Sequence, residues 1–190
     1  MNYNFKNTTP DAKSIIHLIA QQGSNLIGLE LGVLKGESLC CILDSCPNIK
    51  TLYGIDTWEP YDDYLAYEHR TTPLYSVDKK TQEVCEFLTY HNIKWCDNGH
   101  KAKIIKGDSN KCLDKFKNKS LDFIFFDAYM TKEQAMNDLE LWIPKIKKGG
   151  LVIGHDWTAI DIQETIHNYR KKYNIKSLLS VYDNTWVWRK

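Results

Sequence analysis

Apolar residues in this chain gather in short β-rich runs that alternate with segments of helical periodicity. The runs predict strands that are buried on both faces, as in a parallel sheet covered by helices. They lie at residues 25–31, 51–55, 102–105, 121–126 and 151–154. Around them, apolar residues recur at i, i+3, i+4 and i+7, which is typical of amphipathic helices. We expect helices at residues 11–22, 39–46, 84–91, 108–116, 135–143 and 162–173.

The C-terminal end departs from this alternation. Residues 175–181 and 185–188 predict a pair of antiparallel edge strands. The whole pattern therefore predicts an α/β fold, with a doubly wound, mainly parallel seven-stranded sheet, a C-terminal antiparallel β-hairpin and helices on both faces.

Residues 57–77 have no clear period and hold four tyrosines, one tryptophan and two prolines. We interpret this stretch as a long loop or insertion, and such loops often shape a site. Its aromatic residues either form an apolar wall for a ligand or simply pack the loop onto the domain. No linker or repeat divides the rest, so the 190 residues are expected to form one domain over 1–190.

Composition and charge exclude several classes of function. Lys plus Arg number 25 against 24 Asp plus Glu, so a net charge of +1 gives no electrostatic reason to bind nucleic acid or an anionic membrane. No apolar run approaches the roughly 18 residues of a membrane span, and the N-terminal residues are polar. The six cysteines show no zinc-ligand spacing. We expect a cytoplasmic protein with a small-molecule partner, and the sequence leaves homo-oligomer formation open.

The segment after the first predicted strand is rich in glycine. Its pattern is Glu30-x-Gly32-x-x-x-Gly36, and a predicted helix follows. Glycine permits positive φ and lets a ligand approach the backbone at the start of a helix. The dinucleotide fingerprint Gly-x-Gly-x-x-Gly is absent, because Val33 or Leu34 occupies the place of its second glycine. For this segment alone, a tight turn without a ligand stays the alternative.

Acidic residues stand at the ends of five successive predicted strands. In open α/β sheets, ligands bind outside the carboxyl ends of the strands, so these side chains are expected to face one crevice. A carboxylate after the second strand can accept two hydrogen bonds from a ribose diol, and one after the third can accept a hydrogen bond from an adenine amino group. Each alone can instead be a helix N-cap or a solvated carboxylate. The residues are Glu30, Asp56, Asp108, Asp127 and Asp156.

Five segments carry these residues: Glu30–Ser38 (ELGVLKGES), Tyr53–Trp58 (YGIDTW), Lys106–Ser109 (KGDS), Leu121–Ala128 (LDFIFFDA) and Gly149–Trp157 (GGLVIGHDW). In order and spacing they resemble the class I S-adenosylmethionine methyltransferases, in particular the small sugar and antibiotic O-methyltransferases of the macrocin type and the cephalosporin-hydroxylase-like group. The resemblance covers residues 25–158 and implies a Rossmann-like fold. A terminal β-hairpin after a doubly wound sheet also fits this architecture better than that of a dehydrogenase.

The resemblance implies a role for each matching position. It assigns nine residues to S-adenosylmethionine, from the methionine end of the cofactor to its adenine end. These are Glu30, Gly32, Gly36 and Ser38 for the methionine part, Asp56 and Thr57 for the ribose, Asp108 and Ser109 for the adenine, and Asp127 beside the transferable methyl group.

The resemblance also implies a metal site. Metal-dependent members carry a carboxylate after the fourth strand and an acidic pair after the fifth, which hold a Mg²⁺ ion that binds the substrate hydroxyls. Asp127 and Asp156 match these positions, whereas His155 replaces the first acid of the pair. A nitrogen ligand disfavours Mg²⁺ relative to another divalent metal. The expected ligand set is Asp127, Asp156 and His155.

Methyl transfer to a hydroxyl requires a proton acceptor, because the hydroxyl must lose its proton as it attacks. The candidates are Asp127 and His155. Many relatives carry a histidine shortly after the fourth-strand aspartate, where this chain has Met130, so that base is absent. His155 can instead be a structural residue, hydrogen-bonded in the floor of the crevice.

The sequence as a whole predicts an S-adenosylmethionine-dependent O-methyltransferase that acts on a small molecule such as a sugar or a glycosylated metabolite. Two alternatives stay open. The departures at Met130 and His155 favour a non-catalytic nucleoside-binding domain. A nicotinamide-dependent oxidoreductase uses a similar fold, but the missing glycine disfavours it.

Overall fold

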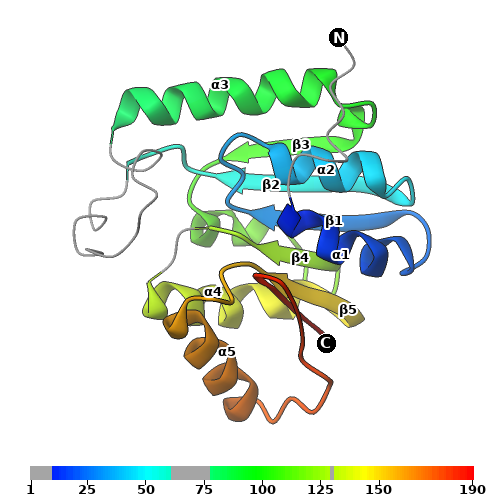
Figure 1. The fold of residues 1–190 in the computed structure, drawn as a ribbon, viewed down its shortest axis with the longest axis vertical. Helices are drawn as coiled ribbons and strands as arrows, with labels where there is room; N and C mark the ends of the chain where they lie inside the picture. Colours follow the sequence, from blue (N-terminus) through cyan, green and yellow to red (C-terminus); the bar gives the residue numbers. More distant parts are fainter. Residues whose placement is uncertain (1–9, 61–77, 129–130) are drawn as a thin grey trace.

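The computed structural model describes residues 10–60, 78–128 and 131–190. Within them the strands form one seven-stranded sheet in the order β3-β2-β1-β4-β5-β7-β6 (Figure 1). Strands β1 to β5 are parallel, and β7 runs antiparallel to both β5 and β6. The strands are β1 (Leu26–Leu31), β2 (Ile49–Asp56), β3 (Ala102–Lys106), β4 (Leu121–Phe126), β5 (Ile146–Gly154), β6 (Ser180–Tyr182) and β7 (Thr185–Arg189).

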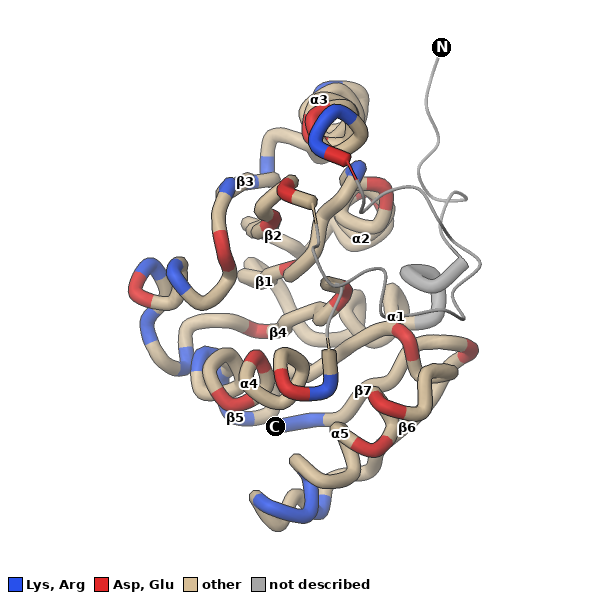
Figure 2. The backbone as a smooth tube through the Cα atoms, turned by 90° about the vertical axis from the view of Figure 1, so that its left-hand side faces the viewer, with Lys and Arg blue, Asp and Glu red and all other residues tan. Residues whose placement is uncertain are grey.

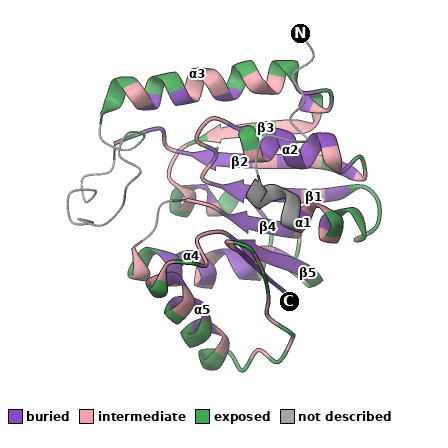
Figure 3. Cartoon of the chain, in the orientation of Figure 1, coloured by how far each residue is buried: buried purple, intermediate pink, exposed green. Residues whose placement is uncertain are grey.

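Helices cover both faces of this sheet, and each face has its own apolar core (Figure 3). Successive residues of β4 serve opposite cores: Phe123 and Phe125 pack with the first three helices, whereas Ile124 and Phe126 pack with the last two. This explains why β4 is apolar on both faces from Phe123 to Phe126. The helices are α1 (Pro10–Ala20), α2 (Glu37–Ser45) and α3 (Lys79–Trp95) on one face, and α4 (Lys132–Trp142) and α5 (Ile160–Lys172) on the other.

The fold class predicted from the pattern is confirmed, and most strand boundaries lie within two residues of the predicted ones, but those of β5 and β6 differ by more. β5 begins at Ile146, five residues before the predicted start, because Gly149 and Gly150 lie within a bulge rather than ending a loop. Leu121 pairs with Ile146 but Phe123 already pairs with Leu151, so extra residues bulge out of β5 between these pairs. β6 is also shorter than the predicted run and covers three residues.

Two predictions from the sequence lie outside the described residues. Most of the expected insertion falls in residues 61–77, and Met130 belongs to residues 129–130. In the part of the chain that is described, no helix is long and apolar enough to cross a membrane.

The parallel order brings the loops after β1 to β5 to one edge of the sheet (Figure 1). β1 lies between β2 and β4, so the direction of winding changes between β1 and β4. Ligands of open α/β sheets bind at this kind of switch point. The acidic residues at the strand ends therefore gather where the fold places a site.

Candidate active site

The loop after β1 contains three residues with left-handed backbone, Gly32 (φ 85°), Leu34 (φ 50°) and Gly36 (φ 73°). At Gly32 a Cβ atom would lie 2.5 Å from both the Cα of Ala128 and the carbonyl oxygen of Asp127. No side chain fits there, because the obstacle is backbone. Gly32 thus allows the loops after β1 and β4 to contact each other directly.

Asp56, the last residue of β2, binds the loop Gly32–Gly36, called the glycine loop below, through its side chain. Its Oδ2 accepts hydrogen bonds from the backbone N–H groups of Val33 and Leu34, both at 2.8 Å, and its Oδ1 accepts one from the N–H of Trp58 at 2.9 Å. The residue is 9% exposed. Three of the roughly four acceptor positions of this carboxylate are therefore filled by backbone donors. Its predicted contact with a ribose stays a prediction.

Three further side chains bind the carbonyl groups of the glycine loop. The carbonyl oxygen of Leu34 accepts from Trp58 Nε1 at 2.7 Å and from Thr89 Oγ1 of α3 at 2.8 Å. Asn92 of α3 donates to the carbonyl oxygen of Lys35 at 2.9 Å. Trp58 is buried and belongs to the core, so it packs the domain rather than forming a wall of the cavity. Both N–H groups and carbonyl groups of the glycine loop are therefore held by side chains from other elements.

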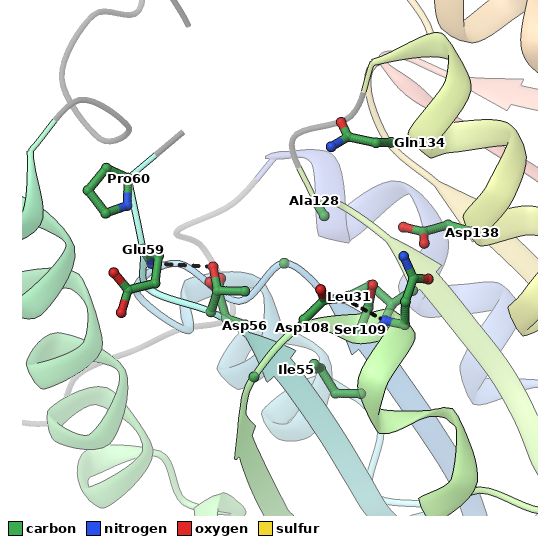
Figure 4. Close-up of a pocket in the computed structure, with 14 residues that line it drawn as sticks. Leu31, Ile55, Asp56, Glu59, Pro60, Asp108, Ser109, Ala128, Gln134 and Asp138 are labelled. Carbon is green, nitrogen blue, oxygen red and sulfur yellow. Dashed lines mark hydrogen bonds between the residues drawn. The ribbon is translucent and has the colours of Figure 1, made fainter. Parts of the chain in front are cut away.

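A cavity of about 330 Å³ opens above the strand ends (Figure 4). Five residues predicted to bind the cofactor line it: Gly32, Asp56, Thr57, Asp108 and Ser109. Its lining does not include Glu30, Gly36, Ser38, Asp127 or His155. Glu30 and Asp127 are each followed in the chain by a lining residue, Leu31 and Ala128 respectively. The lining also contains residues that the sequence did not single out, namely Glu59, Pro60, Gly107, Asn110, Gln134 and Asp138.

Asp108 and Asp138 approach one end of this cavity from different elements (Figure 4). Asp108 caps the 3-10 helix Ser109–Lys115 by accepting from the N–H of Asn110 at 2.8 Å. Asp138 lies on α4 and is only 6% exposed. Burial, with a smaller contribution from the charge of Asp108, raises the pKa of Asp138 to about 6, and a hydrogen bond with Ser109 opposes this shift.

The sequence carries a signal for Asp138 in the pattern of its helix. Ala135, Asp138, Leu139 and Trp142 are the buried residues of α4, and they follow helical spacing. A carboxylate on the buried stripe of an amphipathic helix is unusual, because burying a charge is costly unless it is paired. Such a residue is a candidate for a functional role.

Glu30 lies near the end of β1 and is 0% exposed. Its Oε1 accepts a hydrogen bond from Ser38 Oγ of α2, whereas its Oε2 has no partner among the described residues. Burial raises the pKa of Glu30 well above its ordinary value, and the nearby charges of Asp127 and Asp56 raise it further. The arrangement leaves one buried acceptor unsatisfied.

His155 contacts both other residues predicted after β4 and β5, Asp127 and Asp156. Its Nδ1 atom lies 3.4 Å from Asp127 Oδ1 and 3.2 Å from Asp156 Oδ1. Its Nε2 atom lies 3.2 Å from the side-chain amide nitrogen of Asn184, in the turn between β6 and β7. Asp156 has left-handed backbone (φ 60°), which is uncommon for a residue other than glycine.

The metal prediction is not supported by the donor geometry. Among the described side chains, no group of three or more His, Cys, Asp or Glu is arranged to hold a metal ion.

Asn184, which contacts His155, has no signal in the sequence because its position depends on how the C-terminal hairpin packs.

A family model described as "Methyltransferase domain" matches residues 29–157. This range includes the glycine loop, Asp56 and Asp108, together with Asp127, His155 and Asp156. The chain belongs to this methyltransferase family. No curated protein matches it in sequence.

Solved structures share the fold of this methyltransferase at low identity. The O-methyltransferase NovP is 17% identical with a TM-score of 0.64, over 98% of this chain and 78% of NovP. An O-methyltransferase from Bacillus cereus in complex with SAH is 15% identical with a TM-score of 0.64, over 100% of this chain and 85% of that one. TomG from Streptomyces achromogenes, in complex with SAM, is 12% identical with a TM-score of 0.64, over 96% of this chain and 81% of TomG.

The electrostatics of the methyltransferase site favour a cation. Glu30, Asp56 and Asp127 lie close enough that the two aspartates raise the pKa of the glutamate. Like charges in a poorly solvated region repel each other, and a bound cation relieves that repulsion. The site can therefore bind a positively charged ligand above the ends of β1, β2 and β4.

Proposed function

We propose that this protein transfers a methyl group from S-adenosylmethionine to a hydroxyl oxygen of a small molecule, such as a sugar or a glycosylated metabolite. The observation that carries the proposal is the unpartnered Oε2 of Glu30, buried beside Asp56 and Asp127. S-adenosylmethionine carries an ammonium and a sulfonium, so it supplies both the hydrogen-bond donor and the positive charge that this region lacks.

The cavity offers partners for the rest of the cofactor. Gly32 and the fixed glycine loop would face the methionine part, and Asp56 with Thr57 would approach the ribose. Asp56 has little remaining acceptor capacity, so Glu59 on the same side of the cavity is a further candidate for the ribose hydroxyls. Asp108, Ser109 and Asp138 would surround the adenine at the other end (Figure 4).

When bound, S-adenosylmethionine would supply an activated methyl group for in-line displacement by the acceptor oxygen. Asp127 would accept the proton that the hydroxyl loses, because it directly follows β4 beside Ala128 of the cavity wall and its side chain is 27% exposed. His155 faces Asp127 and Asp156 through one nitrogen and Asn184 through the other. These residues do not fit a metal ligand set that includes His155, and we derive no step through a metal.

Two observations support a small acceptor with a reactive oxygen. The similar structures NovP and TomG are both described as O-methyltransferases, and TomG is described as involved in tomaymycin synthesis. Lys and Arg are interspersed with Asp and Glu over the side of the molecule that Figure 2 presents. A net charge of +1 likewise gives no general attraction for nucleic acid.

The proposal is tested by calorimetry with S-adenosylmethionine, S-adenosylhomocysteine and NAD. The wild type should bind the first two and not NAD. Glu30→Gln should weaken S-adenosylmethionine binding by about 10-fold to 100-fold, because a charge-assisted hydrogen bond contributes about 1.5–3 kcal/mol. Glu83→Gln, the same change on the exposed side of α3, is the matched control and should bind like the wild type.

Two results would contradict the proposal. Binding of NAD without S-adenosylmethionine would indicate the oxidoreductase alternative. Cofactor binding without methyl transfer to any member of a panel of hydroxylated acceptors would indicate a non-catalytic nucleoside-binding domain.

A further inference from the structure

The turn between β6 and β7 is joined to the loop after β5 through the side chain of Asn184. Its Oδ1 accepts two hydrogen bonds from Thr158, one from the backbone N–H and one from Oγ1, both at 2.8 Å. A backbone N–H can only donate, so the amide atom that faces it must be the oxygen. The orientation of the Asn184 amide group is thereby determined.

This orientation determines the tautomer of His155. The other amide atom of Asn184 is the nitrogen, which can only donate, and it lies 3.2 Å from His155 Nε2. Nε2 must therefore accept, so it carries no proton. A neutral imidazole has one N–H, which is then on Nδ1, the atom that faces Asp127 at 3.4 Å and Asp156 at 3.2 Å.

Further contacts hold the turn between β6 and β7 against the loop after β5. The N–H of Trp157 donates to the carbonyl oxygen of Asn184 at 3.0 Å, and Trp186 Nε1 donates to the carbonyl oxygen of His155 at 2.9 Å. At Gly154, a Cβ atom would lie only 1.9 Å from the ring of Trp186, so the hairpin packs directly on the end of β5. The hairpin and the β5 loop cannot shift independently.

We propose that Asn184 is a positioning residue of the catalytic site. By accepting from Thr158 and donating to Nε2, it makes His155 a donor toward Asp127 and Asp156. His155 then orients these carboxylates and is neither the proton acceptor nor a metal ligand, because its only ring lone pair is bound to Asn184. The catalytic consequence rests on the proposed function, whereas the tautomer does not.

The tautomer is measured directly in the wild-type protein by nitrogen-15 NMR of its imidazole rings. The His155 signals are assigned by their loss in His155→Gln. Nε2 should appear as an unprotonated nitrogen and Nδ1 as a protonated one. The reverse pattern would overturn the proposal. This measurement needs neither cofactor nor turnover, so its failure is distinct from a failure to bind S-adenosylmethionine.

The catalytic consequence is tested with Asn184→Asp. The new carboxylate can only accept from Nε2, so Nε2 should gain a proton. We expect kcat to fall by about 10-fold or more, the usual scale for misplaced catalytic groups, with unchanged affinity for S-adenosylhomocysteine. Asn168→Asp, the same change on the exposed side of α5, should retain the wild-type kcat and the wild-type His155 signals. A protonated Nε2 with an unchanged kcat would show that Asn184 has no positioning role.

Discussion

Two buried carboxyl groups at neighbouring strand ends differ in how their oxygens are satisfied. Asp56, at the end of β2, accepts three backbone hydrogen bonds and is 9% exposed. Glu30, on β1, is 0% exposed and accepts from Ser38, while its Oε2 has no partner among the described residues. Both carboxyl groups are buried, but only that of Asp56 has its oxygens largely satisfied by hydrogen bonds.

This difference distinguishes a carboxylate that stabilises the fold from one that is available to bind a ligand. A buried carboxylate with filled acceptors stabilises the fold, because its hydrogen bonds offset the loss of hydration. One with an unfilled acceptor destabilises the fold until a ligand supplies the donor, which is a typical exchange of stability for function. On this reasoning Asp56 shapes the cofactor loop, and Glu30 retains capacity for the cofactor itself.

Removing Asp56 should have the largest effect on stability. Asp56→Ala leaves the N–H groups of Val33, Leu34 and Trp58 without their acceptor, so we expect the free energy of unfolding to fall by about 3 kcal/mol or more. Urea denaturation measures this loss. Asp97→Ala removes an exposed aspartate and should change stability by less than about 0.5 kcal/mol. A near-wild-type stability together with lost cofactor binding would instead make Asp56 a ligand-binding residue.

Asp138→Asn should have a smaller effect of opposite sign. Because the folded state raises the pKa of Asp138 from 3.8 to about 6, stability is lost as pH rises through that window. The amide removes this cost, so the variant should be more stable than the wild type by about 1–3 kcal/mol at a pH of about 7.5. Near a pH of about 4 the two proteins should converge.

Urea denaturation at both pH values checks the Asp138 prediction. A stability difference that is the same at both would mean that Asp138 does not titrate between them. If Asp138 also approaches the adenine, the stabilised variant should bind S-adenosylmethionine more weakly, as expected for a residue that contributes to the site at a cost to the fold.

The sequence predicts the central strands well because both of their faces are buried. The pattern predicts β4 at 121–126, and the strand occupies Leu121–Phe126, because the near-continuous apolar run is typical of a strand buried on both faces. The predicted start of β5 is wrong because Gly149 and Gly150 are typical of a turn, although here they form a bulge inside a pairing with β4. Local composition does not separate these two uses of glycine.

The site was predictable only where it depends on strand ends. Asp127, His155 and Asp156 come together because the ends of β4 and β5 are neighbours in a parallel sheet. Asp138 and Asn184 join the site from a helix and from the terminal hairpin, and their partners depend on packing between distant segments. The sequence also could not tell that the oxygens of Asp56 bind backbone, because an acid at a strand end suits either role.

The smallest effect should be a proton released when the cofactor binds. Burial, Asp127 and Asp56 raise the pKa of Glu30 in the unliganded protein, and an ammonium placed at Oε2 would lower it again. Between these two pKa values binding releases up to about one proton, so affinity should rise with pH. Calorimetry in two buffers of different ionisation enthalpy measures the release, and Glu30→Gln should abolish it. Equal release by the wild type and Glu30→Gln would assign the proton to another group and remove the contrast between Glu30 and Asp56.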